Sequence, residues 1–132
     1  MRILVADDNR DAADTLATLL RLWGHEVRVA YDGLAALVTA HDFKPHSALL
    51  DIQMPRVNGG EAALFLRRQA ELEGIFLVAT SASDRNDPRV ARYDGAFDAH
   101  FSKPYDLDRL AELLSSRPSR VCHRHSPTAC AG

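Results

Sequence analysis

The stretch "MRILVADDNRDAADTLATLLRLWGHEVRVA", residues 1–30, contains the pattern that decides the fold. Its short apolar run at 2–6 stops at two acidic residues, which is typical of a buried strand. Asn9 is suited to cap a helix and Gly24 to end it. Between them, apolar residues recur at helical spacing: Ala12, Ala13, Leu16, Leu19, Leu20 and Trp23. A second apolar run at 26–30 completes a predicted strand–helix–strand unit.

The rest of the chain repeats this unit. We expect further strands at 47–51, at 75–80 and in the segment ending near Lys103. We expect further helices from 33 to about 40, after the capping-box spacing of Asn58 and Glu61, within 81–95, and after Asp106. Unbroken apolar strands separated by helices favour a parallel sheet covered on both faces. The predicted fold class is therefore α/β, a doubly wound five-stranded parallel sheet of (βα)5 units with strand order 2-1-3-4-5.

Length and composition predict one ordinary globular domain. The chain has 132 residues, of which 46% are apolar and 26% charged, and its net charge is -2. This balance favours no direct nucleic-acid or membrane partner. Apolar periodicity stops near residue 116, so we expect a domain over 1–116 and a poorly ordered tail over 117–132. Both cysteines, Cys122 and Cys130, belong to that tail. A folded part without disulfides and without a secretory pattern predicts a cytoplasmic protein.

Polar residues capable of chemistry stand at the predicted strand ends. Asp7 and Asp8 follow the first strand, Asp51 closes the third, Thr80 the fourth and Lys103 the fifth. In a parallel sheet these ends share one edge, where ligands bind near the switch in strand order. Converging carboxylates require a compensating cation, and hard oxygen ligands with room for water suit Mg²⁺. We therefore expect a divalent-metal site, with Asp51 placed to attack phosphorus and form an aspartyl phosphate.

Four segments carry a resemblance to a known family. "LVADDN", "LLDIQMP", "VATSAS" and "FSKPY" occur in this order, each at the end of a predicted strand. In this respect residues 2–116 resemble the receiver domains of two-component response regulators, whose fold is flavodoxin-like, or CheY-like. The resemblance implies a signalling module that takes a phosphoryl group from a histidine kinase or a histidine phosphotransfer protein. It implies a phosphoprotein that assists its own phosphorylation and dephosphorylation, not an enzyme that turns over a substrate.

The resemblance also implies a metal-binding set. Asp51 corresponds to the phospho-acceptor and, together with Asp8, to the direct ligands of Mg²⁺. Asp7 would act on the metal through water, and the backbone carbonyl of Gln53 would complete the protein ligands.

A second set implied by the resemblance concerns switching. Thr80 corresponds to the switch hydroxyl, Lys103 to the lysine that contacts the phosphoryl group, and His100 to an aromatic switch position. Phosphorylation would draw the Thr80 hydroxyl inward and let the His100 ring rotate. The face of the fourth helix, fifth strand and fifth helix would then change its preference for an output partner.

Other functions remain as alternatives. The chain could be a receiver module cut from a hybrid histidine kinase, or a degenerate receiver, although the matched acidic, threonine and lysine positions are all filled. A Mg²⁺-dependent phosphohydrolase with an aspartyl nucleophile needs a second Asp two positions after Asp51, where this chain has Gln53. A flavin carrier needs a phosphate-binding loop after the first strand, and the acidic loop here would repel a phosphate.

Overall fold

The computed structural model describes most of the predicted domain. The described residues are 1–54, 57–69, 72, 74–81, 94–102 and 107–115. Three predictions fall outside them: the tail at 117–132, Lys103, and most of the helix expected within 81–95.

Five parallel strands form a single sheet in the order β2-β1-β3-β4-β5, as predicted. The strands are β1 (Arg2–Ala6), β2 (Glu26–Ala30), β3 (Ser47–Asp51), β4 (Phe76–Ser81) and β5 (Ala99–Ser102). The central strands are mostly apolar and almost wholly buried, because helices cover both faces of a parallel sheet. The register sets Ala6 beside Leu50, and Asp51 beside Thr80. The carboxyl ends of β1, β3 and β4 therefore meet at one edge of the sheet.

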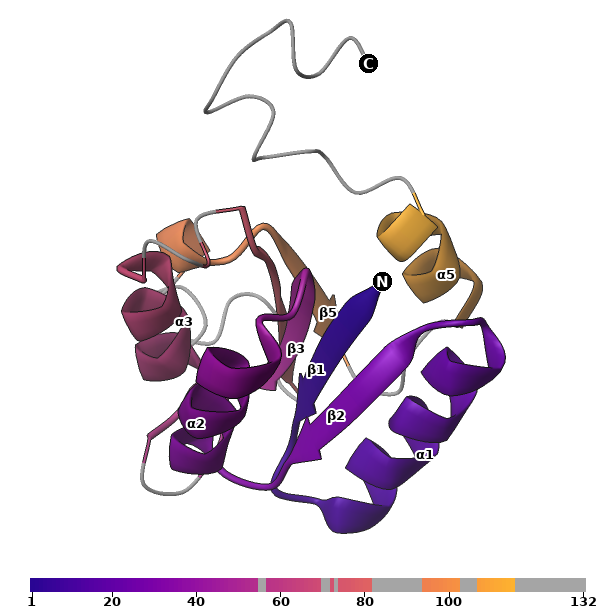
Figure 1. Cartoon of the computed structure of the whole chain (residues 1–132), viewed down its shortest axis with the longest axis horizontal. Helices are drawn as coiled ribbons and strands as arrows, with labels where there is room; N and C mark the ends of the chain where they lie inside the picture. The colour runs from indigo at the N-terminus through magenta and orange to yellow at the C-terminus, as the bar shows by residue number, and fades with distance from the viewer. Residues whose placement is uncertain (55–56, 70–71, 73, 82–93, 103–106, 116–132) are drawn as a thin grey trace, which may run out of the picture.

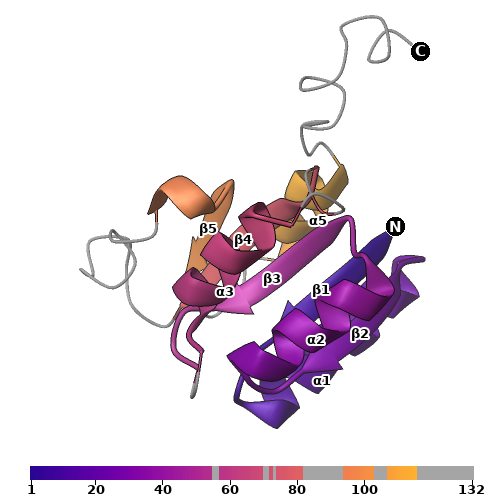
Figure 2. The same cartoon turned by 60° about the vertical axis from the view of Figure 1, so that its left-hand side comes forward.

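Helices cover both faces of this sheet. α1 (Arg10–Leu22) and α5 (Leu107–Ser115) lie on one face, and α2 (Gly33–Phe43) and α3 (Gly59–Arg67) lie on the other (Figures 1 and 2). Alternate residues of β1 serve the two cores: Ile3 and Val5 pack with α1, while Leu4 and Ala6 pack with α2 and α3. The fold class predicted from the sequence is confirmed by this arrangement.

Capping side chains mark where α1 and α3 begin, and a glycine follows the end of α1. The Asn9 side chain accepts from the Ala12 N–H, and Asn58 and Glu61 form the predicted capping box. Gly24 follows α1 at φ 96°, a left-handed conformation that glycine adopts without strain. Asp32 caps α2, and α2 continues to Phe43, beyond the predicted end near residue 40.

Two further features concern the exposure of α1 and the apolar character of the helices. The apolar stripe of α1 is mostly buried, but Trp23 at its end is 36% exposed. Among the residues that the structure describes, no helix combines the length and the apolar character needed to cross a membrane.

Candidate functional site

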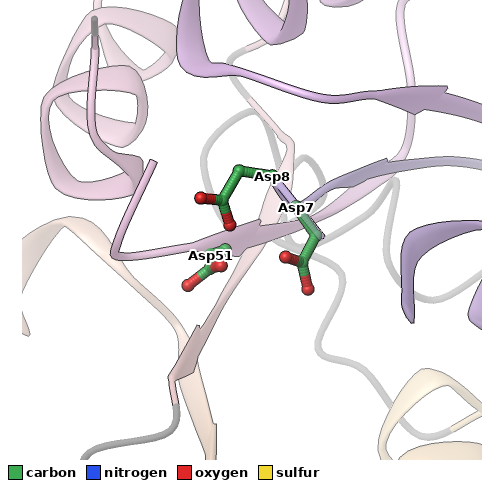
Figure 3. A group of neighbouring side chains, drawn as sticks. All are labelled: Asp7, Asp8 and Asp51. Atoms are coloured by element: carbon green, nitrogen blue, oxygen red, sulfur yellow. The ribbon is translucent and has the colours of Figure 1, made fainter. Parts of the chain in front are cut away.

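Three carboxylates converge at the carboxyl edge of the sheet. Asp7 and Asp8 directly follow β1, and Asp51 is the last residue of the neighbouring β3. Figure 3 shows the three side chains grouped at this edge, and one oxygen from each lies within 4.8 Å of the others. Asp7 and Asp51 are only 3% and 4% exposed, whereas Asp8 is exposed. The convergence predicted from the strand ends is therefore present in the structure.

Backbone N–H groups orient the two buried carboxylates. The Asn9 N–H donates to Asp7 Oδ1 at 3.0 Å, and the Gln53 N–H donates to Asp51 Oδ1 at 3.0 Å. Both bonds join a carboxylate to the residue two positions later, so each loop folds back onto its own aspartate. The Asp7 N–H also donates to the Ala30 carbonyl at 3.1 Å, which extends the β1–β2 pairing to this residue. These bonds hold the carboxylates in place before any ligand arrives.

Gly59 forms part of the support behind Asp51, a contribution that the sequence reasoning missed. A Cβ at Gly59 would lie 2.3 Å from the Asp51 carbonyl oxygen, so only glycine allows α3 to begin this close to the strand end. The Gly59 N–H donates to the Ile52 carbonyl at 3.3 Å. The sequence carried a signal of this close contact, because two successive glycines, Gly59 and Gly60, stand at the start of a predicted helix. Glycine is a poor helix former, so its use there indicates close packing.

Of the other predicted site residues, Thr80, Gln53 and His100 lie within the described part of the chain. Thr80 is buried beside Asp51, and its carbonyl accepts from the Ile52 N–H at 3.0 Å. Gln53 is exposed at the start of the loop after β3. His100 is half-buried on β5, beside Ala79 of β4. Lys103 lies one residue beyond the described end of β5, outside the described residues.

Tyr31 fixes the rim of this edge near the start of α1. Its hydroxyl donates to Asp14 Oδ1 at 2.7 Å, and the Arg10 guanidinium lies 4.2 Å from its ring centroid. The hydrogen bond to the Asp14 carboxylate raises the pKa of Tyr31, because only the neutral hydroxyl can donate this bond. The bond joins the end of β2 to α1.

The donor set fits a hard divalent cation. Carboxylate oxygens are the ligands that Mg²⁺ takes from proteins, usually one or two of them with waters completing the shell. Two of these carboxylates are buried, where their mutual repulsion is weakly screened and favours a bound cation. An anion would meet only repulsion from the described side chains of the cluster.

We expect Mg²⁺ to stabilise the fold measurably. At ten times its dissociation constant, a ligand that binds only the native state adds about 1.4 kcal/mol, or roughly 4 to 8 °C in melting temperature. Asp51→Asn should raise the metal-free melting temperature by relieving repulsion, while the amide oxygen can still accept from the Gln53 N–H. The same substitution should shrink the response to Mg²⁺. Thermal unfolding of the unmodified protein and of Asp51→Asn, without Mg²⁺ and at several millimolar concentrations of it, measures both effects.

The control for this prediction is Asp108→Asn, which removes an exposed carboxylate from α5. This variant should respond to Mg²⁺ like the unmodified protein. An unmodified protein that does not respond to millimolar Mg²⁺ would show that the three carboxylates do not form a metal site.

Comparison with known proteins shows the family. The family model described as the response regulator receiver domain matches residues 3–115. The chain belongs to this family. The receiver is 34% identical over 110 residues to the response regulator MprA of Mycobacterium avium strain 104, a match that covers 83% of this chain and 47% of that protein. A related MprA from Mycobacterium sp. strain KMS is 34% identical over 127 residues and is covered to 54%. The receiver thus spans about half the length of the curated relatives it matches.

Solved structures share the fold. The response regulator TrrA of Thermotoga maritima, solved in complex with Mg²⁺-BeF, is 28% identical and has a TM-score of 0.75, over 86% of this chain and 96% of that one. The receiver domain of a sensor histidine kinase from Pseudomonas aeruginosa PAO1, solved with a magnesium ion in its active site cleft, has a TM-score of 0.78 at 22% identity. That match covers 86% of this chain and 93% of the other. At this level of identity it supports the fold of the receiver alone.

Proposed function

We propose that this receiver accepts a phosphoryl group on Asp51 and thereby changes the partners it binds. The observation that carries the proposal is the convergence of the Asp7, Asp8 and Asp51 oxygens within 4.8 Å at the carboxyl edge of the sheet. Membership of the receiver family supports it, and so does the Mg²⁺-BeF complex of TrrA, since beryllofluoride is a phosphoryl mimic. In this proposal Asp8 and Asp51 would hold Mg²⁺ directly, Asp7 would act through water and the Gln53 carbonyl would complete the protein ligands.

The transfer step needs few protein groups. An Asp51 carboxylate oxygen forms a bond to phosphorus while the bond from phosphorus to the donor's imidazole nitrogen breaks. The freed imidazole takes a proton from solvent, and Asp51 becomes an acyl phosphate. The Gln53 N–H, 3.0 Å from Asp51 Oδ1, fixes the direction of the attacking group. The metal, when bound, neutralises charge on the phosphoryl oxygens.

In the proposed switch, the charge of the phosphoryl group on Asp51 changes the conformation of the receiver through Thr80, Lys103 and His100. Thr80 is buried next to Asp51 in the sheet, where its hydroxyl can donate to a phosphoryl oxygen. Lys103 follows β5 in the sequence and supplies the cation that contacts the phosphoryl group. His100 on β5 then takes a new ring position. To move a two-state equilibrium from about 1:99 to 99:1, these contacts must differ by ~5.5 kcal/mol between the two states.

The partners follow from this chemistry. A histidine kinase or a histidine phosphotransfer protein supplies the phosphoryl group, and an output partner binds the face of β5 and α5 together with the helix expected within 81–95. We place the protein in the cytoplasm, and we assign residues 1–116 to the receiver domain.

We expect stable phosphorylation of the unmodified protein at one site. Incubation with Mg²⁺ and acetyl phosphate should add the mass of one phosphoryl group, because the transfer breaks the bond to acetate and leaves the acyl phosphate on Asp51. Asp51→Asn should show no gain, and chelation of Mg²⁺ should abolish the gain in the unmodified protein. Intact-mass spectrometry measures all three results.

Asp108→Asn is again the matched control and should be phosphorylated like the unmodified protein. Retention of the mass gain by Asp51→Asn would contradict the proposal. Repeated release of phosphate, many times per protein molecule, would indicate phosphohydrolase activity and contradict the proposed role of a phospho-acceptor.

A further inference from the structure

Arg67, at the end of α3, joins that helix to two other elements. Its Nε donates to the Ala96 carbonyl at 3.1 Å, and its Nη1 donates to the Ile75 carbonyl at 2.7 Å. Its Nη2 donates to Asp98 Oδ2 at 2.6 Å, a charge-assisted bond. Ala96 closes the short 3-10 turn η2 (Asp94–Ala96), and Ile75 directly precedes β4. One guanidinium thus connects α3 to the start of β4 and to the segment that leads into β5.

Asp98 completes the connection from the other side. Its Oδ2 accepts from the Leu77 N–H at 2.8 Å, and its own N–H donates to the Leu77 carbonyl at 2.7 Å. The Arg67 and Asp98 side chains are only 17% and 7% exposed. A charge pair this deep is held by its partners rather than by water, so its geometry is strongly restricted.

This pair stands where β5 begins. β5 has four residues and, among the strands that the structure describes, stands last in the sheet and pairs with β4 alone. An edge strand with a single neighbour has fewer hydrogen bonds to hold its position than a central strand has. Asp98 immediately precedes β5, stands two residues before His100 and five before Lys103. Its link to Leu77 and Arg67 therefore sets the starting position of the strand that carries the proposed switch residue.

The opposite end of α3 lies against the phospho-acceptor. Gly59 packs directly on the Asp51 carbonyl, and α3 contacts β3, β4 and η2 along its nine residues (Figure 2). A helix of nine residues is about 13.5 Å long and behaves as a stiff element. α3 therefore spans the distance from Asp51 to the start of β5, with a tight contact at each end.

We propose that Arg67 and Asp98 are positioning residues of the switch: their ion pair fixes the start of β5, so that His100 responds to a phosphoryl group on Asp51. The inference rests on the proposed function, because it concerns how the signal from Asp51 reaches β5. Neither side chain touches the phosphoryl group. Their loss should leave loading of Asp51 largely intact and weaken the response of β5.

The experiment uses the full chain labelled with ¹⁵N, titrated with beryllofluoride in saturating Mg²⁺, well below the melting temperature of every variant. The Gln53 amide, which donates to Asp51, reports binding, and the Ala99, His100 and Phe101 amides report β5. In Arg67→Met and Asp98→Asn we expect the shifts of the β5 amides to fall at least twofold. The apparent Kd from the Gln53 amide should change less than threefold. Arg67→Lys keeps the charge but not the planar fork, and should recover part of the β5 response.

Arg68→Met is the matched control, because it removes an exposed guanidinium one residue away, and it should behave like the unmodified protein. Full β5 shifts in both Arg67→Met and Asp98→Asn, with normal movement of the Gln53 amide, would overturn the positioning role alone. An unmodified protein whose Gln53 amide does not respond would overturn the proposed function, and this inference with it. Asp98→Asn retains an acceptor for the Leu77 N–H, so the test stands even if Arg67→Met fails to fold.

Discussion

Gly33→Ala should destabilise the fold by about 3 kcal/mol or more, because the added methyl group has no room. A Cβ at Gly33 would lie 1.6 Å from the Val57 carbonyl oxygen and 2.5 Å from its carbonyl carbon. Both are backbone atoms, which cannot rotate away as the end of a flexible side chain can. Relief would require α2 to move away from the loop that joins Asp51 to α3, which would open the core that α2 and α3 share.

Gly95→Ala is the control for this substitution. A Cβ there would meet nothing within 4 Å, so the free energy of unfolding should change by no more than about 0.5 kcal/mol. Urea denaturation of both variants measures the difference. Equal stability of the two variants would show that the contact between α2 and Val57 is looser in solution than in the structure.

The fold could be predicted from the sequence because its signals are local. Each strand is a short apolar run, each helix shows its own period, and caps such as Asn9 and Gly24 stand at the expected positions. Parallel pairing then follows from strands that are apolar on both faces. The end of α2 was less predictable: Lys44, at its C-terminus, adopts the left-handed conformation, and no glycine marks the position.

The candidate site was predictable for a related reason. Parallel strands bring their carboxyl ends to one edge, so residues that close β1, β3 and β4 must be neighbours once the strand order is known. Once the strand order is known, Asp7, Asp8, Asp51 and Thr80 are predicted to lie together although they are distant in the sequence. Topology alone was enough to predict this grouping, without knowledge of any side-chain conformation.

The supports of the site were not predictable in the same way. Gly33 and Gly59 matter because of the backbone atoms of Val57 and Asp51 that they approach, and these contacts depend on exact helix placement. The pair of Arg67 and Asp98 joins residues 31 positions apart, on elements that sequence pattern assigns separately. An arginine at a helix end and an acid before a strand both read as surface charges until the packing is known.

Arg67→Met should lower the free energy of unfolding by about 1.5 to 3 kcal/mol, because it removes the guanidinium that donates to the largely buried Asp98 carboxylate. It also removes the donors to the Ala96 and Ile75 carbonyls. Arg68→Met, which removes an exposed arginine, should change stability by about 0.5 kcal/mol or less. Urea denaturation of the two variants provides the comparison.

The double variant gives a sharper test, because the second substitution is expected to increase the free energy of unfolding instead of lowering it further. Adding Asp98→Asn to Arg67→Met removes the carboxylate that has lost its guanidinium donor but keeps an acceptor for the Leu77 N–H, so stability should recover by about 1 kcal/mol or more. Alone, Asp98→Asn should destabilise, because it leaves the guanidinium facing a neutral group. Two losses that simply add would show that Arg67 and Asp98 stabilise the fold independently. A substitution that destabilises the native chain but stabilises the Arg67→Met variant is the behaviour expected of two energetically coupled side chains.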